Sequence, residues 1–251
     1  MTIKTRIAFA AAAVSLVLTG AAPALAESFS ADQREEIGKI IKDYLLSHPD
    51  VMQDVMAELE KRQQAAETAK HRAAVAENKA TLFSSPHQVV LGNPQGNVTM
   101  VEFFDYNCGY CKRAMSDMLD LIKTDNNLKF VLKEFPVLGE GSVEAARVAV
   151  AARMQDPNGK KYIEFHQKLL GSRGGADKMR ALAVAKEVGF DMPRLERDMG
   201  SDEVKKTIDE NMKLAEALGL NGTPSYVVGE EVVIGAVGLD ALREKIGAER
   251  K

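Results

Sequence analysis

Apolar residues in the first part of the chain recur at helical spacing. The first set follows the i, i+3, i+4, i+7, i+8 pattern of one helical face and comprises Ile37, Ile40, Ile41, Tyr44 and Leu45. His48-Pro49 interrupts this helix, because the residue before a proline is pushed out of the α region, and Pro49 suits the first turn of a second helix. The apolar face of that second helix comprises Val51, Met52, Val55, Met56 and Leu59.

Residues 60–80 carry alanine at nearly all of their apolar positions, among Lys, Arg, Glu and Gln. Good helix formers with little to bury predict an exposed, stalk-like helix. The two apolar faces that precede it are too small to hold a core alone. We therefore expect this region either to associate with copies of itself, which the stalk favours, or to fold back on its own chain.

The pattern changes near Ser84-Ser85-Pro86, where strand-like runs begin. The predicted strands are 87–91, 98–104, 128–135, 225–228 and 232–234. Helices are predicted at 109–123 and 239–246, and the long stretch 139–219 is almost wholly helical. This order predicts an α/β fold in which a helical insertion separates two groups of strands in the sequence.

The only cysteines of the chain, Cys108 and Cys111, lie where a predicted strand gives way to a predicted helix. A Cys-x-x-Cys pair in this position is typical of a thioredoxin-like redox centre. The free N–H groups and the positive dipole end of the helix stabilise a thiolate on the first cysteine. The two intervening residues, Gly109 and Tyr110, let the second cysteine reach back and close a disulfide.

A structural disulfide and a zinc site are the alternative roles of this cysteine pair. A disulfide that closes a four-residue ring contributes about 2 kcal/mol at most, less than one that closes a longer loop. Structural zinc generally needs four Cys or His ligands. No metal-ligand spacing is present among the histidines, for which we expect surface or capping roles: His48, His71, His87 and His166. The sequence thus predicts redox chemistry, with no metal and no cofactor beyond the Cys108–Cys111 disulfide.

Residues 1–26 have the pattern of a secretory signal peptide. Lys4 and Arg6 form a charged n-region, residues 7–18 an apolar core, and Ala24-Leu25-Ala26 a cleavage site. The net charge of −3 gives no indication of nucleic-acid binding, since that needs a basic surface. We expect a mature protein in the periplasm, an oxidising compartment.

Three motifs together resemble the DsbA-like periplasmic thiol–disulfide oxidoreductases. They are Val101-Glu-Phe-Phe-Asp-Tyr-Asn-Cys-Gly-Tyr-Cys111, Lys133-Glu-Phe-Pro136 and Gly222-Thr-Pro224. The resemblance implies a thioredoxin fold with an inserted helical layer at about 139–219. It runs from about Pro86 to the C-terminus.

The segment 37–64 is similar to the N-terminal region of the suppressor-of-copper-sensitivity C proteins. In that subfamily, the resemblance implies, N-terminal helices can join catalytic domains into a trimer that isomerises disulfides. The expected organisation is a signal peptide over 1–26, a helical oligomerisation region over 27–84 and a DsbA-like domain over 85–251.

The resemblance implies a role for each residue of the Cys-x-x-Cys motif. Cys108 matches the nucleophile, and Cys111 matches the buried thiol that resolves the mixed disulfide. Gly109 and Tyr110 lie between the thiols, where they help to set the redox poise and meet the substrate.

Three further residues match functional positions of the family. Thr223 and Pro224 match a cis-proline loop, in which the backbone of Thr223 pairs with an extended substrate peptide. Glu102 matches an acidic residue beneath Cys111, where burial raises the carboxyl pKa and the acid transfers protons. The alternative for Glu102 is an acid that is paired or solvated at the end of its strand.

These observations predict a periplasmic thiol–disulfide oxidoreductase, in the form of an oligomeric disulfide isomerase or reductase, with a trimer favoured. Its partners would be unfolded or misfolded periplasmic proteins and a membrane protein that recycles the thiols. Two alternatives stay open. One is a monomeric dithiol oxidase, and the other, from a different class, is a copper-tolerance protein that binds Cu(I) through both thiolates.

Overall fold

Residues 29–156 and 158–250 are described by the computed structural model, and they fall into two compact units that divide between Glu58 and Leu59. The predicted signal peptide, residues 1–26, lies outside the described residues. No helix in the described part of the chain is both long and apolar enough to cross a bilayer.

The first unit contains helix α1 (Ala31–Ser47) and the beginning of helix α2 (Pro49–Glu77). Ser30 caps α1, because its hydroxyl accepts a hydrogen bond from Gln33 N at 3.2 Å while the Gln33 side chain accepts one from Ser30 N at 2.9 Å. The helix ends at Ser47, and His48, the residue before Pro49, is its C-cap outside the α region, as the sequence predicts. No residue of α1 is buried, and most of its large apolar side chains are exposed.

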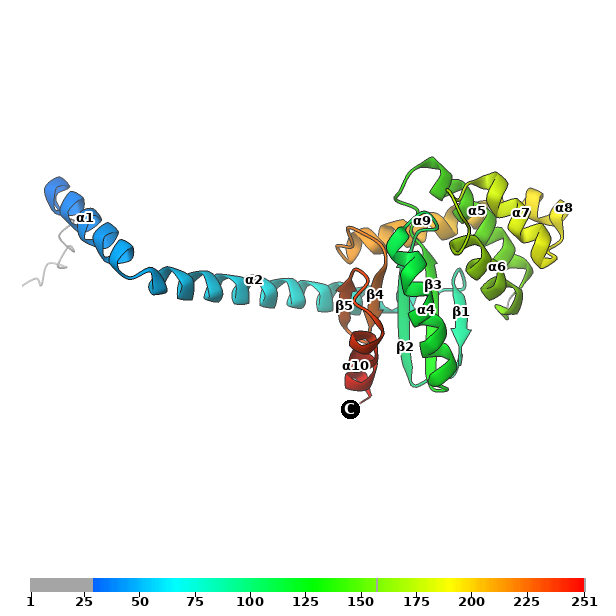
Figure 1. Cartoon of the computed structure of the whole chain (residues 1–251), viewed down its shortest axis with the longest axis horizontal. Helices are drawn as coiled ribbons and strands as arrows, with labels where there is room; N and C mark the ends of the chain where they lie inside the picture. The colour runs from blue at the N-terminus through cyan, green and yellow to red at the C-terminus, as the bar shows by residue number, and fades with distance from the viewer. Residues whose placement is uncertain (1–28, 157, 251) are drawn as a thin grey trace, which may run out of the picture. The chain divides into compact units, whose positions relative to one another are not determined.

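The second unit is built on a five-stranded sheet in the order β1-β3-β2-β4-β5 (Figure 1). Strands β2 and β3 are parallel, and the other neighbouring pairs are antiparallel. The strands are β1 (Val89–Gly92), β2 (Val98–Phe104), β3 (Leu128–Glu134), β4 (Ser225–Val228) and β5 (Glu231–Ile234).

The helices of the second unit follow the predicted order. They are α3 (Lys79–Ser84), α4 (Gly109–Thr124), α5 (Glu140–Gln155), α6 (Lys160–Leu170), α7 (Lys178–Val188), α8 (Met192–Asp198), α9 (Asp202–Ala217) and α10 (Leu239–Glu249). Helices α5 to α9 form the insertion, and Figure 1 shows α5, α6, α7 and α8 gathered in one cluster. The predicted α/β arrangement with a helical insertion is confirmed.

Both faces of the sheet are covered, which explains why β2 is a nearly continuous apolar run. Met100 and Phe104 of β2 belong to one apolar cluster with Met118 of α4. Val101 and Phe103 belong to a second cluster, on the opposite face. Because successive side chains of a strand alternate, Glu102 lies on the α4 side with Met100 and Phe104.

The segment before β1 packs into the second unit more closely than its composition predicts. Val75 of α2 and Leu82 of α3 are buried in the second apolar cluster. The buried Lys133 of β3 donates from Nζ to the Thr81 carbonyl at 3.0 Å. The division between Glu58 and Leu59 therefore falls before the expected domain boundary at 84/85, and residues 60–80 are not exposed throughout.

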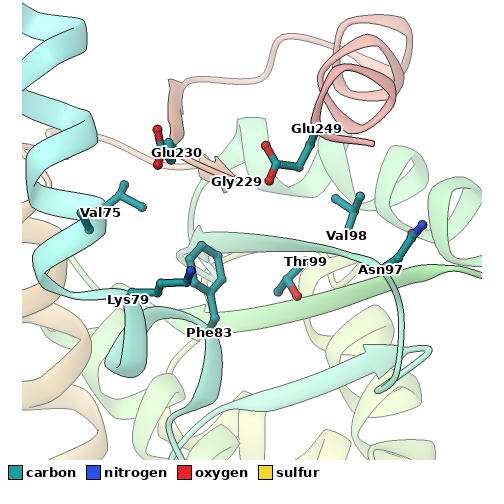
Figure 2. A pocket seen from close by; sticks show the side chains of 10 residues that line it. Val75, Lys79, Phe83, Asn97, Val98, Thr99, Gly229, Glu230 and Glu249 are labelled. Atoms are coloured by element: carbon teal, nitrogen blue, oxygen red, sulfur yellow. The ribbon is translucent and has the colours of Figure 1, made fainter. Parts of the chain in front are cut away.

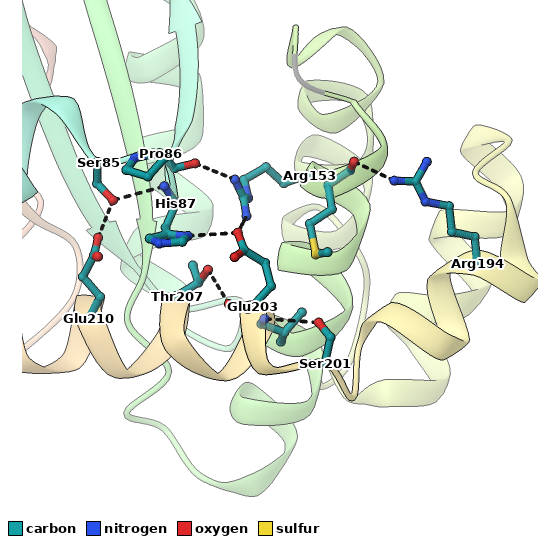
Figure 3. A network of polar contacts seen from close by, with 11 residues as sticks. Ser85, Pro86, His87, Arg153, Arg194, Ser201, Glu203, Thr207 and Glu210 are labelled. Carbon is teal, nitrogen blue, oxygen red and sulfur yellow. Dashed lines mark hydrogen bonds and ion pairs between the residues drawn. The ribbon is translucent and has the colours of Figure 1, made fainter.

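A polar network fixes the chain where it enters β1 (Figure 3). Arg153 of α5 donates to the Pro86 carbonyl and to Glu203 Oε1, each at 2.9 Å. His87 Nδ1 lies 2.9 Å from the same Glu203 oxygen. The network joins the entry segment to α5 and α9, so the insertion is held against the sheet by charge as well as by apolar packing.

Replacing Asn211 by leucine is expected to stabilise the second unit. Asn211 of α9 is fully buried, and neither its side-chain Nδ2 nor its Oδ1 has a hydrogen-bond partner among the described residues. A buried polar group without a partner costs about 1–3 kcal/mol, so Asn211→Leu should raise the free energy of unfolding by an amount in this range. Urea unfolding measures it. Lys213→Leu, on the exposed face of the same helix, should change little, and a less stable Asn211→Leu would contradict the prediction.

Candidate active site

The two cysteines lie at the start of α4, where β2 ends. Cys108 is the N-cap residue of α4 in an extended conformation, and Cys111 lies in the first turn. Both are free thiols and both are buried, with Cys111 the less accessible at 1% exposure. The helix N-terminus thus presents its free N–H groups beside the first sulfur, which is the arrangement that stabilises a thiolate.

Thr223 and Pro224 lie beside Cys108, as the sequence predicts, although 115 residues separate Cys108 from Thr223. The Cys108 thiol donates a hydrogen bond to the Thr223 carbonyl oxygen at 3.0 Å. The Thr223–Pro224 peptide bond is cis. Pro224 leads directly into β4, the neighbour of β2, so the sheet itself brings the loop to the thiol.

Gly109 and Tyr110 are both exposed beside the cysteines. The Tyr110 ring is 59% exposed, and the Arg113 guanidinium carbon lies 4.3 Å above its centre. A Cβ atom at Gly109 would meet nothing within 4 Å. Glycine is therefore not required there by packing, and the approach to the thiols stays open on this side.

Glu102 is buried in β2, where its register partners are Leu132 of β3 and Tyr226 of β4. Burial, and to a smaller extent the charge of Asp117 on α4, raises the pKa of the Glu102 carboxyl to about 8. Glu102 is thus not solvated at a strand end. A carboxyl with this pKa exchanges its proton near neutral pH, which suits it to proton transfer.

Cys111 is a neighbour of this carboxyl. Burial, and next the negative charge of Glu102, raises the pKa of the Cys111 thiol. The pKa of Tyr226 is raised by the same two effects. Burial and the neighbouring charge thus both favour the protonated form of Cys111.

A buried polar cluster next to the site could not be found from spacing alone. Tyr162 of α6 donates to Glu134 Oε1 at 2.8 Å, and its hydroxyl lies 3.2 Å from that of Tyr106. His166 Nδ1 lies 3.3 Å from the Tyr106 hydroxyl. Burial lowers the pKa of His166 to about 3, so this imidazole is neutral. The expectation of a surface or capping role is wrong for His166, because α6 turns it toward the sheet.

Several surface cavities lie away from the cysteines. One cavity of about 410 Å³ is lined by residues such as Val75, Lys79, Thr99 and Glu249 (Figure 2). The cavity opens near the first residues of β2, whereas the cysteines follow the last residue of that strand. Within residues 29–156 and 158–250, no group of three or more His, Cys, Asp and Glu side chains is arranged to hold a metal ion.

Two family models match the chain. One, described as a DSBA-like thioredoxin domain, matches residues 99–247. The other, described as the N-terminal domain of the copper resistance protein ScsC, matches residues 33–66. The first match contains both cysteines, Glu102, Thr223 and Pro224, and the second covers most of α1 and part of α2.

Three known proteins illustrate the similarity. Disulfide bond formation protein D of Bacillus subtilis (strain 168) is 26% identical over 174 residues, which cover 65% of this chain and 78% of that protein. The crystal structure of a thioredoxin-like oxidoreductase from Silicibacter pomeroyi DSS-3 is 47% identical, covers 69% of this chain and 98% of its own, and gives a TM-score of 0.65. Proteus mirabilis ScsC in a transitional conformation is 25% identical, with coverage of 88% and 97% and a TM-score of 0.64.

The chain also matches a part of some membrane transporters. It is 26% identical over 153 residues to the Na(+)/H(+) antiporter NhaA 1 of Salinispora arenicola (strain CNS-205). These residues span 23% of the antiporter, so the match concerns one segment of that protein.

Proposed function

Because the chain belongs to the family of DSBA-like thioredoxin domains, we propose that it is an oligomeric disulfide isomerase or reductase of other proteins. The family match, and relatives named for disulfide formation and thiol–disulfide exchange, support the oxidoreductase class itself. The predicted resemblance to DsbA-like and ScsC proteins and the thioredoxin fold that it implied are confirmed. What we propose beyond this class is the isomerase activity, the oligomeric assembly and the protein substrates.

The exchange begins at the Cys108 sulfur. As a thiolate, it attacks one sulfur of a substrate disulfide, so that a mixed disulfide forms and the substrate's S–S bond breaks. The other substrate sulfur leaves as a thiolate and attacks a different disulfide of the substrate. The thiolate displaced there attacks the mixed disulfide, which releases Cys108 as a thiolate and leaves a rearranged substrate with no net transfer of electrons. The hydrogen bond from the thiol to Thr223 O holds the sulfur beside the loop where an extended peptide would pair.

Cys111 completes the reaction when reshuffling stalls. It passes its proton to the Glu102 carboxylate and attacks the Cys108 sulfur, which releases the substrate as a thiol and leaves a Cys108–Cys111 disulfide. Two electrons pass from the two thiols to the substrate. A membrane partner that reduces this disulfide would restore the enzyme, and the expected signal peptide supports export of the enzyme to the periplasm.

Exposed apolar side chains around the thiols support an unfolded polypeptide as substrate. Val137, Leu138 and Tyr110 are each at least 41% exposed, and Ile234 of β5 stands opposite Ser225, the residue after Pro224. An extended apolar segment can cover these side chains while its backbone meets Thr223. Folded proteins rarely offer such a segment.

The exposed apolar face of the first unit carries the proposal of an oligomer. Ile40, Ile41 and Tyr44 of α1 and Met56 of α2 are all more than half exposed. Such a face is costly in water unless another surface covers it. Further copies of the same face would cover it, and the resemblance of this segment to the ScsC N-terminal domain is the ground on which we propose a trimer. Linked copies bring several active sites to one substrate.

Removal of residues 29–58 from the mature protein tests this assembly. Light scattering is expected to show a trimer for residues 27–251 and a monomer after the removal. Isomerisation of a protein with scrambled disulfides should fall at least tenfold, because linked sites raise the local concentration of catalytic thiols. Oxidation of a dithiol peptide should continue, since one catalytic unit suffices.

Ile41→Asp provides a matched variant of full length. It places a charge on the exposed apolar face of α1. Like the removal of residues 29–58, it should give a monomer and lower the isomerisation of the scrambled protein at least tenfold. A monomeric full-length protein would refute the oligomer and favour the alternative, a monomeric dithiol oxidase. A trimer that persists in both variants would show that the association lies elsewhere.

A further inference from the structure

Asp105 accepts four hydrogen bonds from a buried position three residues before Cys108. Its side chain is 2% exposed, and each carboxylate oxygen accepts two donors. Hydrogen bonds to a charged group are among the strong ones in proteins. The two oxygens serve two different parts of the site.

The first oxygen, Oδ1, holds the turn that carries the nucleophile. It accepts from Asn107 N at 2.8 Å and from the Ser142 hydroxyl at 2.7 Å. The Asn107 side chain donates in turn to Ser142 Oγ at 2.9 Å and to the Ala176 carbonyl at 2.8 Å, and it accepts from Ala176 N at 2.7 Å. The residue before Cys108 is therefore fastened to the insertion at two points.

The second oxygen, Oδ2, holds the loop that carries exposed apolar side chains. It accepts from the backbone N–H groups of Val137 and Leu138, each at 2.9 Å. These side chains are 41% and 52% exposed. A single carboxylate thus fixes the cysteine turn and an apolar loop relative to each other.

We propose that Asp105 is a positioning residue that aligns the Cys108 sulfur with a substrate segment docked on Val137 and Leu138. This inference rests on the proposed thiol–disulfide exchange and deepens it. Oδ1 sets where the sulfur lies, and Oδ2 sets where the apolar segment of the substrate lies. If the Asp105 carboxylate served stability alone, it would hold the cysteine turn and the apolar loop in place. Docking of a substrate on that loop would then have no effect on the attack by Cys108.

Asp105→Asn tests the inference, because the amide keeps the shape of the side chain but its NH₂ group cannot accept a hydrogen bond. In this variant an NH₂ group replaces one of the two carboxylate oxygens, so the two hydrogen bonds that this oxygen accepted are lost. Two disulfide substrates are compared: an apolar peptide that reaches the loop, and glutathione disulfide, which is too small to cover it. We expect kcat/KM for the peptide to fall at least tenfold more than that for glutathione disulfide.

Two variants separate the two halves of the carboxylate. Ser142→Ala removes a donor to Oδ1 and the acceptor of one Asn107 N–H, and it leaves the two bonds to Oδ2 in place. It should lower kcat for the peptide with KM unchanged, and should affect glutathione disulfide much less. Leu138→Ala removes an apolar contact only, and should raise KM for the peptide without affecting glutathione disulfide. Either variant keeps the inference testable if Asp105→Asn does not fold.

The chain offers a matched control in Asp125. Its Oδ1 also accepts from the backbone N–H two residues on, that of Asn127, at 3.0 Å, but it lies after α4 and away from the thiols. Asp125→Asn should change thermal stability without changing kcat or KM. Equal losses for both substrates in Asp105→Asn, or a loss of stability alone, would overturn the inference while the proposed function stands. A wild-type protein without exchange activity would refute the proposed function as well.

Discussion

Replacing Cys108 by serine is expected to abolish thiol–disulfide exchange, whereas Cys111→Ser is expected to trap the substrate. A hydroxyl at position 108 cannot form the mixed disulfide. With Cys108 intact and position 111 unable to resolve it, the mixed disulfide accumulates. Non-reducing electrophoresis after incubation with a scrambled disulfide protein measures the adduct, and a reductant should remove it.

The double variant is the control for this pair. Without either thiol, no adduct should form and the helix should persist, because serine hydroxyls can replace the thiols in their hydrogen bonds with the Thr223 and Asp105 backbone. An adduct that forms in Cys108→Ser but not in Cys111→Ser would reverse the assigned roles. Activity that survives in Cys108→Ser would refute the redox centre itself.

Local patterns were sufficient to predict the core of the fold. The apolar run 98–104 predicted a strand covered on both faces, and Met100 and Val101 indeed lie in different apolar clusters. Alternation along the same strand also decides that Glu102 faces α4 and hence Cys111. These features depend on a periodicity of two and on one helix start, both of which are readable in a single sequence.

Contacts between distant segments could not be predicted in this way. Asp105 meets Val137 and Ser142, and His166 meets Tyr106, over separations of 32 to 60 residues that no local pattern encodes. Their only signal was polarity next to a buried strand and a redox motif. The burial of Val75 could not be predicted for a similar reason, because an alanine-rich helix gives little sign of a buried position.

The predicted signal peptide and the predicted oligomer stay predictions. The first lies outside the described residues. The second depends on surfaces of other copies, and the exposed apolar face of α1 is the feature that supports it. In both cases the sequence pattern is specific, but the process that it implies, export or association with other copies, involves molecules other than this single chain.

Exchange of Glu102 for glutamine is expected to stabilise the protein at neutral pH, more than the other single substitutions proposed for stability. The pKa of this carboxyl is about 8 in the folded protein and 4.5 as its ordinary value. Between these values the folded state keeps a proton that the unfolded state releases, so the free energy of unfolding falls as the pH rises. From pH 4.5 to about pH 7 the fall amounts to about 3 kcal/mol, and it ceases above about pH 8.

The measurement is urea unfolding of the dithiol form at pH 5, 6, 7 and 8. Glutamine stays neutral throughout, so the difference between Glu102→Gln and wild type should grow with pH, while Glu196→Gln, on the exposed surface of α8, should follow wild type. Thiol–disulfide exchange should show the opposite trend, because glutamine cannot take the Cys111 proton: the resolving step slows in Glu102→Gln and loses its rise near pH 8. A constant stability difference across this range would mean that burial does not raise the pKa of the Glu102 carboxyl in the folded protein, and would contradict the prediction. Stability gained together with resolution lost is the combination that identifies a buried acid retained for chemistry.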